Sequence, residues 1–307
     1  MEIIKILKAL GDETRFRIIQ MLHGGTYTVN EILFVIGGRQ SNISHHLKIL
    51  SDNNLVESKK EGMWIYYRLS AFYRTHIANI IDKIDRNWLP EEIENDCVKI
   101  DLILKKRQEQ AEKYFASIDD AGQKQLMSFL DNIFSSAEVA ELIKEKYHTI
   151  LDVGCGNGRN LPVLAPFCEK VIGVDYSAKM LQMAEHLAKK AQLNYELFNS
   201  DITSLPFADE SIDAVFISMV LHHVPVPQAA VNEAARVLNC NGKIFLIDMA
   251  EHNDESLRDE HGDLWLGFSE EDLISWINAA GLRVEMQMSK AYYMQHKILI
   301  IKATKPE

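Results

Sequence analysis

The sequence has few cysteines and no long apolar run, and each absence excludes a class of protein. Its four cysteines form no CxxC or CxC pair, which argues against a disulfide framework or a cysteine-built zinc site and fits a reducing cytoplasm. No stretch approaches 18 uninterrupted apolar residues, and the first residues form an amphipathic pattern rather than a signal peptide. We therefore expect a cytoplasmic protein with no membrane span.

The chain also lacks the bias of a disordered or fibrous protein. Its 307 residues are 47% hydrophobic and 25% charged, an ordinary composition for a folded protein, and this length is typical of two domains. The net charge of −11 is unevenly distributed: residues 1–88 contain 12 lysines and arginines against 9 acidic residues, a net +3, so the remainder carries −14. A mildly basic head on an acidic body indicates two different tasks.

The head has the pattern of four helices followed by a basic hairpin. Apolar residues recur at helical spacing over residues 3–10, 12–22, 29–36 and 40–50, with glycines between these segments. Two β-branched or aromatic runs, 56–59 and 64–69, then flank the turn 60–63. This order predicts a winged helix-turn-helix.

The fourth predicted helix has two different faces. Ile43, Leu47 and Leu50 recur at i, i+4 and i+7 and are expected in the core. The other face is made of hydrogen-bonding side chains, which suit the major groove of DNA. A plain solvated surface is the alternative, but the basic hairpin that follows favours DNA. The predicted DNA-contacting residues are Gln40, Ser41, Ser44, His45 and Lys48 on the helix and Lys59, Lys60 and Arg68 in the hairpin.

Two segments of the head resemble the ArsR/SmtB family of bacterial dimeric repressors: LKALGDETRFRIIQML and RQSNISHHLKILSDNNLVESKKEGMWIYYRLS. The resemblance covers about residues 1–85 and implies a homodimer in which a terminal helix, predicted over Ala71–Trp88, pairs across a two-fold axis. Core packing of that helix is the alternative. The Cys-x-Cys metal site of the family is missing, because Glu31–Ile36 contains no thiol. We therefore disfavour metal sensing and predict no metal ligands.

The body begins after an acidic segment. Pro90–Asp96 is predicted to be a linker, followed by a polar connecting helix over 101–115. The predicted domains are a DNA-binding and dimerisation domain over residues 1–88, a linker over 89–120 and a second domain over 121–307.

Within the second domain, strands alternate with helices such as 177–191 and 227–238. The predicted strands are 149–153, 170–174, 195–199, 212–218, 243–248, 284–288 and 296–302. This alternation predicts an α/β, Rossmann-like fold with a doubly wound, mostly parallel seven-stranded sheet.

The ends of the first two predicted strands suit a ligand. Asp152 precedes glycines at 154, 156 and 158, which let the backbone turn sharply and approach a ligand closely. Their spacing matches neither the dinucleotide fingerprint nor the phosphate-binding P-loop. Asp175 ends the second strand, 23 residues after Asp152, about where an acidic side chain binds a ribose diol.

The next two strands also end in candidate binding residues. The third ends at Asp201-Ile202, and the fourth ends at Ser218, shortly before His222 and His223. Because the carboxyl ends of parallel strands meet at one edge of the sheet, these residues are expected to gather around one ligand.

Four segments of the body resemble class I S-adenosylmethionine-dependent methyltransferases, especially the ubiquinone and menaquinone branch: LDVGCGNGRN, VIGVDYSAKML, NSDITSLPFADESIDAVFISMVLHHV and EAARVLNCNGKIFLIDM. The resemblance covers about residues 115–307 and implies S-adenosylmethionine or S-adenosylhomocysteine as the ligand. It places Gly154 and Gly156 against the methionine moiety, Asp175 on the ribose hydroxyls and Asp201-Ile202 on the adenine. The full set of expected cofactor-binding residues is Asp152, Gly154, Cys155, Gly156, Gly158, Asp175, Tyr176, Asp201, Ile202 and Ser218.

The methyl acceptor has no sequence signature. His222 or His223 could serve as a base for an oxygen or nitrogen acceptor, or could only pack against the cofactor or cap the next helix. Arsenite methylation needs several thiols, and only Cys155 falls in the expected site. Residues 251–268 are expected to form a lid-like helix on the acceptor side.

Two functions remain open. In the first, the chain is a bacterial transcriptional regulator that binds operator DNA and senses S-adenosylmethionine or S-adenosylhomocysteine. In the alternative, it is an active methyltransferase on a small-molecule acceptor whose head regulates its own operon. Both need the whole cofactor site, and the missing acceptor signature favours the first.

Overall fold

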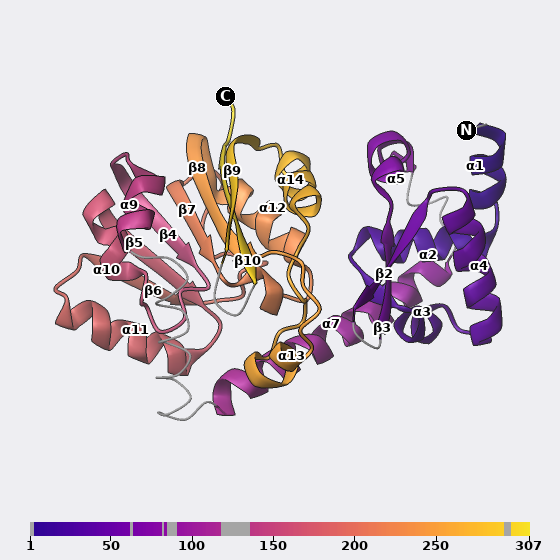
Figure 1. Ribbon diagram of the computed structural model, residues 1–307, viewed down its shortest axis with the longest axis horizontal. Helices are drawn as coiled ribbons and strands as arrows, with labels where there is room; N and C mark the ends of the chain where they lie inside the picture. Colours follow the sequence, from indigo (N-terminus) through magenta and orange to yellow (C-terminus); the bar gives the residue numbers. More distant parts are fainter. Residues whose placement is uncertain (1–2, 62–63, 82, 85–90, 118–135, 292–295) are drawn as a thin grey trace. The chain divides into compact units, whose positions relative to one another are not determined.

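The computed structural model describes residues 3–61, 64–81, 83–84, 91–117, 136–291 and 296–307, arranged in two compact units (Figure 1). The head is Met1–Arg107 and the body is Gln108–Glu307. The predicted domain boundaries at residues 88 and 121 remain interpretations. No helix in the described part of the chain is both long and apolar enough to cross a lipid bilayer.

The head is the predicted winged helix-turn-helix. Its helices are α1 (Ile3–Leu10), α2 (Glu13–His23), α3 (Val29–Ile36) and α4 (Gln40–Asp52), and its antiparallel sheet has the order β1 (Tyr27–Thr28), β3 (Trp64–Leu69), β2 (Val56–Glu61). The side chains of two residues fix where helices start. The Asp12 carboxylate accepts a hydrogen bond from the Arg15 backbone N–H at the start of α2, and Thr28 forms a capping box with Glu31 at the start of α3.

The helix predicted over Ala71–Trp88 is interrupted. The structure instead has α5 (Ala71–His76) and α6 (Ala78–Ile81), separated by Ile77; residues 82 and 85–90 lie outside the described part. Tyr73 and Ile77 are both buried in the head core, which turns the chain inward at the break. The dimer role of this segment stays a prediction.

The predicted acidic linker is the beginning of a long helix packed on the head. Helix α7 (Glu92–Ser117) starts nine residues before the predicted Asp101. Its first turn contains Glu92 and Glu94, which the helix dipole favours. Asp96 accepts two hydrogen bonds of 2.7 Å from the guanidinium of Arg17 in α2. The acidic composition of this segment predicted a solvated linker. Arg17, the residue that pairs with Asp96, is 79 residues away in the chain, so composition does not reveal the pair.

Two further contacts fasten α7 to the head. The Lys99 ammonium donates to the Val35 carbonyl at 2.7 Å, and the Arg107 guanidinium donates to the Glu31 carboxylate at 2.8 Å. Ile103 joins the apolar core of the head. The fold of the head therefore includes residues of α7, which follow the β2–β3 hairpin, the wing, in the chain.

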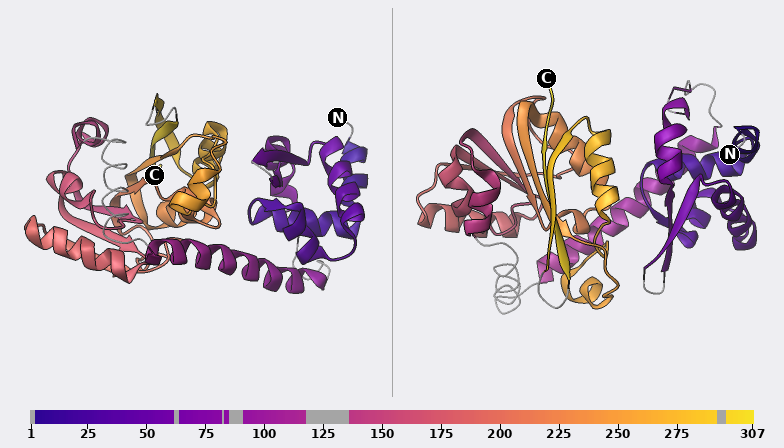
Figure 2. Two further views of the ribbon diagram at one scale, coloured as in Figure 1. Left: turned by 60° about the horizontal axis from the view of Figure 1, so that its bottom comes forward. Right: turned by 45° about the horizontal axis from the view of Figure 1, so that its top comes forward.

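The body contains all seven predicted strands in one sheet, and Figure 2 shows this sheet with helices beside it. Their order is β6-β5-β4-β7-β8-β10-β9, parallel from β6 to β8 and antiparallel around β10. The chain winds outward from β4 in both directions, so the topological switch point lies between β4 and β7, where such sheets bind ligands. The strands are β4 (Tyr147–Val153), β5 (Cys168–Asp175), β6 (Tyr195–Asn199), β7 (Ile212–Ser218), β8 (Leu238–Met249), β9 (Arg283–Ala291) and β10 (Lys297–Thr304).

Helices connect and cover these strands. The central strands are deeply buried, with Ile150, Phe216 and Phe245 at 1% exposure or less. The body helices are α9 (Ser136–Ile143), α10 (Leu161–Leu164), α11 (Ala178–Lys190), α12 (Pro227–Val237), α13 (Ser256–His261) and α14 (Glu270–Ala279), with short 3₁₀ turns η2 (Ala165–Phe167) and η3 (Leu221–His223).

The cysteines are all free thiols. Cys97 in the head and Cys240 in the body are exposed, Cys155 is buried and Cys168 is half-buried. Burial raises the pKa of Cys155 well above its usual value and that of Cys168 to about 11.

We expect Asp96→Asn to loosen the head selectively. Asp96 is 3% exposed, and removing its charge leaves the half-buried Arg17 guanidinium with the more distant, exposed Glu13 carboxylate at 3.9 Å. The opening free energy of amides in α2 and α7, measured by native-state hydrogen exchange, should fall by about 3 kcal/mol. Body amides should be unchanged. Glu13→Gln is the matched control, because Glu13 pairs with the same arginine from an exposed position and should change the value by less than about 0.5 kcal/mol. Equal effects of the two variants would contradict the structural role given to α7.

Candidate functional site

The glycine loop after β4 adopts backbone angles that favour glycine. Gly154 has a φ of 68° and Gly156 a φ of 53°. A Cβ atom at Gly154 would lie 2.6 Å from the Val220 side chain, whereas nothing lies within 4 Å of one at Gly156. Gly154 thus permits the close approach of two loops, and Gly156 leaves open space at the ligand side.

Asp175 supports the same loop from the end of β5. One of its carboxylate oxygens accepts the Gly156 backbone N–H at 2.9 Å, and the other accepts the Ser177 backbone N–H at 2.8 Å. Burial raises the pKa of Asp175, and these two hydrogen bonds oppose the rise. Each oxygen can still accept a further hydrogen bond, so the carboxylate can hold the loop and a diol together.

A cavity lies at the carboxyl ends of β4, β5 and β7 in the body. Eight of the ten predicted cofactor-binding residues line it: Gly154, Cys155, Gly156, Asp175, Tyr176, Asp201, Ile202 and Ser218. Asp201 is exposed and accepts two hydrogen bonds of 2.8 Å from Thr203, while Ile202 is buried. The sheet therefore brings these eight residues to the wall of one cavity, and their role in binding a cofactor stays a prediction.

Asp152 and Gly158 do not line this cavity. Asp152 is 1% exposed, and burial raises its pKa to about 8 against the opposing effects of Asn160 and Arg159. A Cβ atom at Gly158 would lie 2.7 Å from the Cα of Ala184 in α11. Both residues shape the wall behind the glycine loop.

The far end of the cavity is built around η3. His222 and His223 line it together with Leu257, His261 and Asp263 from the segment 251–268. Only Ser256–His261 of that segment is helical, so the predicted lid-like helix is wrong for most of residues 251–268, which form an irregular segment that we call the strap. The backbone N–H groups of Leu264 and Trp265 donate to the His222 carbonyl at 2.9 and 3.1 Å, which ties the strap to η3.

A fully buried carboxylate holds η3 in place. Asp248, at the end of β8, accepts the His222 Nδ1–H at 2.6 Å and the backbone N–H of Leu221 at 2.9 Å. Burial disfavours the charged form of His222, but the charges of Asp248 and Asp263 outweigh burial and raise its pKa to about 9. His222 is thus a charge-paired, oriented side chain rather than a loose surface group.

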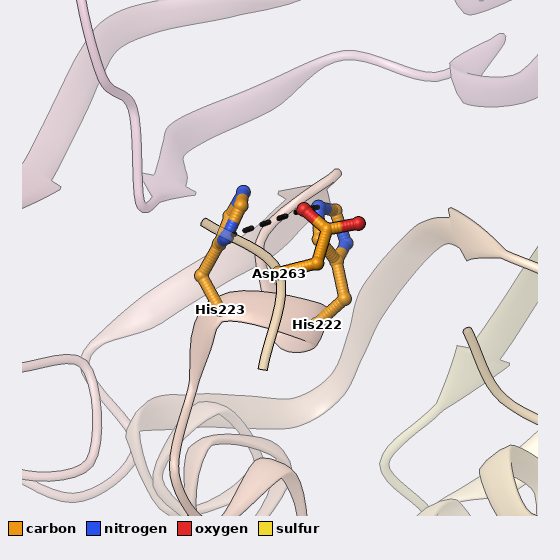
Figure 3. A group of neighbouring side chains, drawn as sticks. All are labelled: His222, His223 and Asp263. Atoms are coloured by element: carbon orange, nitrogen blue, oxygen red, sulfur yellow. Dashed lines mark ion pairs between the residues drawn. The ribbon is translucent and has the colours of Figure 1, made fainter. Parts of the chain in front are cut away.

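His223 and Asp263 stand opposite His222 (Figure 3). The two imidazole rings are 4.1 Å apart between centroids. Burial and the neighbouring charge of His222 lower the pKa of His223 well below its usual value. Burial raises the pKa of Asp263 to about 6, against the charge of His222.

Sequence reasoning missed Asp248 and Asp263 as site residues. Asp248 ends a predicted buried strand, the same signal that identified Asp175. Asp263 had no such signal, because it lies 41 residues after His222 in a segment without periodicity.

The structure exposes the predicted DNA-facing side of α4. The side chains of Gln40, Ser41, Ser44, His45 and Lys48 are all exposed, and those of Ile43, Leu47 and Leu50 are buried as predicted. In the wing, Lys60 is exposed and Lys59 is half-buried. Arg68 donates to the Glu57 carboxylate at 2.8 Å, so a phosphate would have to share it.

The fold defines a winged helix-turn-helix joined to a Rossmann-like domain that carries the cavity. Comparison with known families finds a match within each of the two units. Residues 12–58 match the bacterial regulatory protein family arsR, and residues 151–246 match the methyltransferase domain family. The match supports S-adenosylmethionine as the cofactor or ligand of the body.

Curated relatives match part of the body. An uncharacterized methyltransferase of Bacillus subtilis, YcgJ, is 34% identical over 33% of this chain and 40% of its own length. A demethylmenaquinone methyltransferase of Tropheryma whipplei is 35% identical over 33% of this chain and 41% of its own. The chain thus spans about two fifths of the length of these relatives.

Solved structures share the fold. A candidate methyltransferase of Bacillus halodurans C-125 has a TM-score of 0.51 at 20% identity, covering 56% of this chain and 99% of its own. The [4+2]-cyclase SpnF has a TM-score of 0.50 at 20% identity, covering 56% of this chain and 79% of its own. A cyclase on the same fold means that the fold alone does not specify methyl transfer.

We expect Asp175→Ala to weaken binding of S-adenosylmethionine by about 1–3 kcal/mol, because the ribose hydroxyls lose a charged acceptor. Isothermal titration calorimetry measures the change. Asp209→Ala is the control, since Asp209 is exposed and does not line the cavity. Circular dichroism establishes that both variants are folded. Unchanged affinity in a folded Asp175→Ala variant would remove this carboxylate from the site.

Proposed function

We propose that the chain is a transcriptional regulator whose affinity for DNA depends on S-adenosylmethionine or S-adenosylhomocysteine bound in its body. The observation that carries the proposal is the combination of an exposed polar face on α4 with a cavity that gathers the predicted cofactor residues. The first feature suits base contacts, and the second suits an adenosyl ligand. The head contributes DNA binding, and the body contributes ligand sensing.

The continuity of α7 supports coupling between these tasks. Arg107, the last residue of the head, and Gln108, the first of the body, are consecutive within this one helix. The head half is fixed by the Arg17–Asp96 and Glu31–Arg107 pairs. Glu31 also caps α3, which precedes α4, the proposed DNA-recognition helix. A change that bends or shifts α7 would therefore reach the DNA-binding helices through charged, hydrogen-bonded contacts.

Exposed apolar side chains on the head support a homodimer. Ile3, Ile4 and Leu7 of α1 and Ile80 of α6 are each more than half exposed. Burying such side chains against a second copy would be favourable. Two recognition helices then require DNA half-sites about one helical turn apart.

The alternative is an active methyltransferase on a small-molecule acceptor, with a head that regulates its own operon. Polar groups of the cavity wall favour this alternative, because His222, His223 and Asp263 line the same cavity as the predicted cofactor residues and could contact an acceptor there. Incubating the chain with labelled S-adenosylmethionine and a panel of quinols, amines and thiols distinguishes the two functions. Label transfer at catalytic rates would establish the enzyme.

We expect the two cofactor forms to change DNA affinity by different amounts, because only S-adenosylmethionine carries the sulfonium charge and the methyl group. The coupling should be about 1–3 kcal/mol. The measurement is fluorescence anisotropy at fixed salt, with a duplex selected from a random-sequence pool by the full chain. Asp175→Ala should bind the duplex without responding to either form. Three superimposable wild-type curves, without ligand and with each form, would mean that the two units are merely tethered.

We expect substitutions in the wing and in α4 to have different signatures. Lys59→Gln and Lys60→Gln should weaken binding to all duplexes and reduce the salt dependence by about one unit of slope each, because phosphate contacts release counterions. Ser44→Ala and His45→Ala should instead relax sequence preference. Competition between the selected duplex and a scrambled one measures both. If both pairs of variants behave alike, the two faces do not have separate roles.

A further inference from the structure

Three possible metal-binding atoms converge at the far end of the body cavity. His222 Nε2 lies 3.9 Å from Asp263 Oδ1, and His223 Nδ1 lies 3.8 Å from the same oxygen. All three donor atoms lie within 4.8 Å of one another, and Figure 3 shows Asp263 facing both histidines. The residues come from η3 and from the strap, so the fold rather than local sequence brings them together.

The cluster is buried, unlike an ordinary group of surface charges. The side chains of His222 and Asp263 are 4% and 1% exposed, and that of His223 is 17% exposed. Ionised groups are held in such a place only when opposite charge or hydrogen bonds compensate for lost hydration. The hydrogen-bond and charge partners of each side chain therefore indicate whether the cluster can bind an ion.

Asp263 is the member of the cluster whose carboxylate has no hydrogen bond from the described residues. Both of its carboxylate oxygens are buried and accept no hydrogen bond from them. The two imidazoles, at 3.8 and 3.9 Å, are too distant for hydrogen bonds. Buried carboxylates in folded proteins nearly always have such partners. The charge of His222 at 3.9 Å compensates the carboxylate only at a distance, and a metal ion among the three side chains would coordinate it directly.

The surroundings of His222 prepare it as a ligand. Its Nδ1–H is donated to the Asp248 carboxylate at 2.6 Å. This hydrogen bond directs the opposite nitrogen, Nε2, toward Asp263. A carboxylate behind a histidine is the usual outer partner of a metal-bound imidazole, which it orients and makes more basic. Asp248 is itself fixed by backbone N–H groups of Leu221 and Met249.

We propose that His222 Nε2, His223 Nδ1 and Asp263 Oδ1 bind a divalent transition-metal ion of the zinc type beside the cofactor cavity. His223 Nδ1 lies 3.3 Å from the Gly262 carbonyl, and the ion would replace the proton in that contact and the proton on His222 Nε2. Two imidazoles and one carboxylate suit Zn²⁺, Fe²⁺ or Co²⁺ rather than Ca²⁺ or Mg²⁺, which prefer oxygen ligands alone. Two ligands about 2.1 Å from one ion can be at most about 4.2 Å apart. The separations of 3.8 and 3.9 Å from Asp263 lie within that limit. The third pair of donor atoms lies within 4.8 Å, so a small movement of the side chains is enough to place all three around one ion.

Three protein ligands leave a coordination position free for a small molecule. Since His222, His223 and Asp263 all line the cavity, an oxygen or sulfur atom of a molecule in the cavity could occupy it. The site goes beyond the proposed function, because it requires neither DNA binding nor an adenosyl ligand. The prediction of no metal ligands is explained by their sequence positions: they are not paired cysteines, and they lie outside the head.

The test is metal binding by the full chain after treatment with a chelator. Calorimetry with Zn²⁺ should show one ion per chain at this site, and Co²⁺ should give visible absorption bands typical of nitrogen ligands. Asp263→Asn and His223→Gln should each weaken Zn²⁺ binding by more than the roughly 10–100-fold that loss of an outer hydrogen-bond partner costs. Asp263→Asn preserves shape and removes a buried charge, so we expect it to fold.

Two control variants distinguish metal binding at this cluster from metal binding elsewhere on the chain. His148→Gln removes a histidine that pairs with Glu169 at 2.7 Å on the exposed surface of the body and should leave Zn²⁺ affinity unchanged. Asp175→Ala should also retain the metal, even where it loses S-adenosylmethionine. Zn²⁺ should raise the melting temperature of the wild type and of both controls but not that of Asp263→Asn.

Absence of Zn²⁺ and Co²⁺ binding by the folded wild type would overturn the proposal. Equal Zn²⁺ affinity in the wild type and in both ligand variants would overturn it as well, since the ion would then bind elsewhere. Neither result would bear on DNA binding or on the adenosyl ligand.

Discussion

The buried carboxylate of Asp248 is the interaction on which the ligand-facing end of the body depends. It accepts hydrogen bonds from the backbone of Val220, Leu221 and Met249 and from the His222 imidazole. These bonds compensate for placing a charge at 0% exposure. They also fix the turn after β7 at the topological switch point. The His222 carbonyl then holds the strap, so one side chain organises two walls of the cavity.

Much of this architecture could be predicted from the sequence, because its signals are periodic. The seven strands and the two faces of α4 follow from patterns with a period of two or 3.6 residues. Most of the cavity lining could also be predicted, since residues such as Asp175 and Ile202 lie at or just after strand ends that a parallel sheet brings to one edge. These features need only local spacing and one topological rule.

The features that escaped prediction depend on partners distant in the chain. The acidic start of α7 resembles a solvated linker until Arg17 is placed against Asp96. Asp263 resembles a surface residue until the strap folds over η3. A charged residue has no periodicity of its own, so its burial is decided by a partner that a single sequence does not reveal.

The distribution of thiols has a practical consequence. Maleimide reagents attack the exposed thiolate, so they should modify Cys97 and Cys240. They should spare Cys155, which is buried with a raised pKa, and Cys168, which is half-buried with a pKa of about 11. One reactive position then lies in each unit of the native chain. A donor and an acceptor dye at these positions would turn the unmodified sequence into a molecular ruler, and energy transfer between them would report in real time how head and body move when ligand or DNA is added.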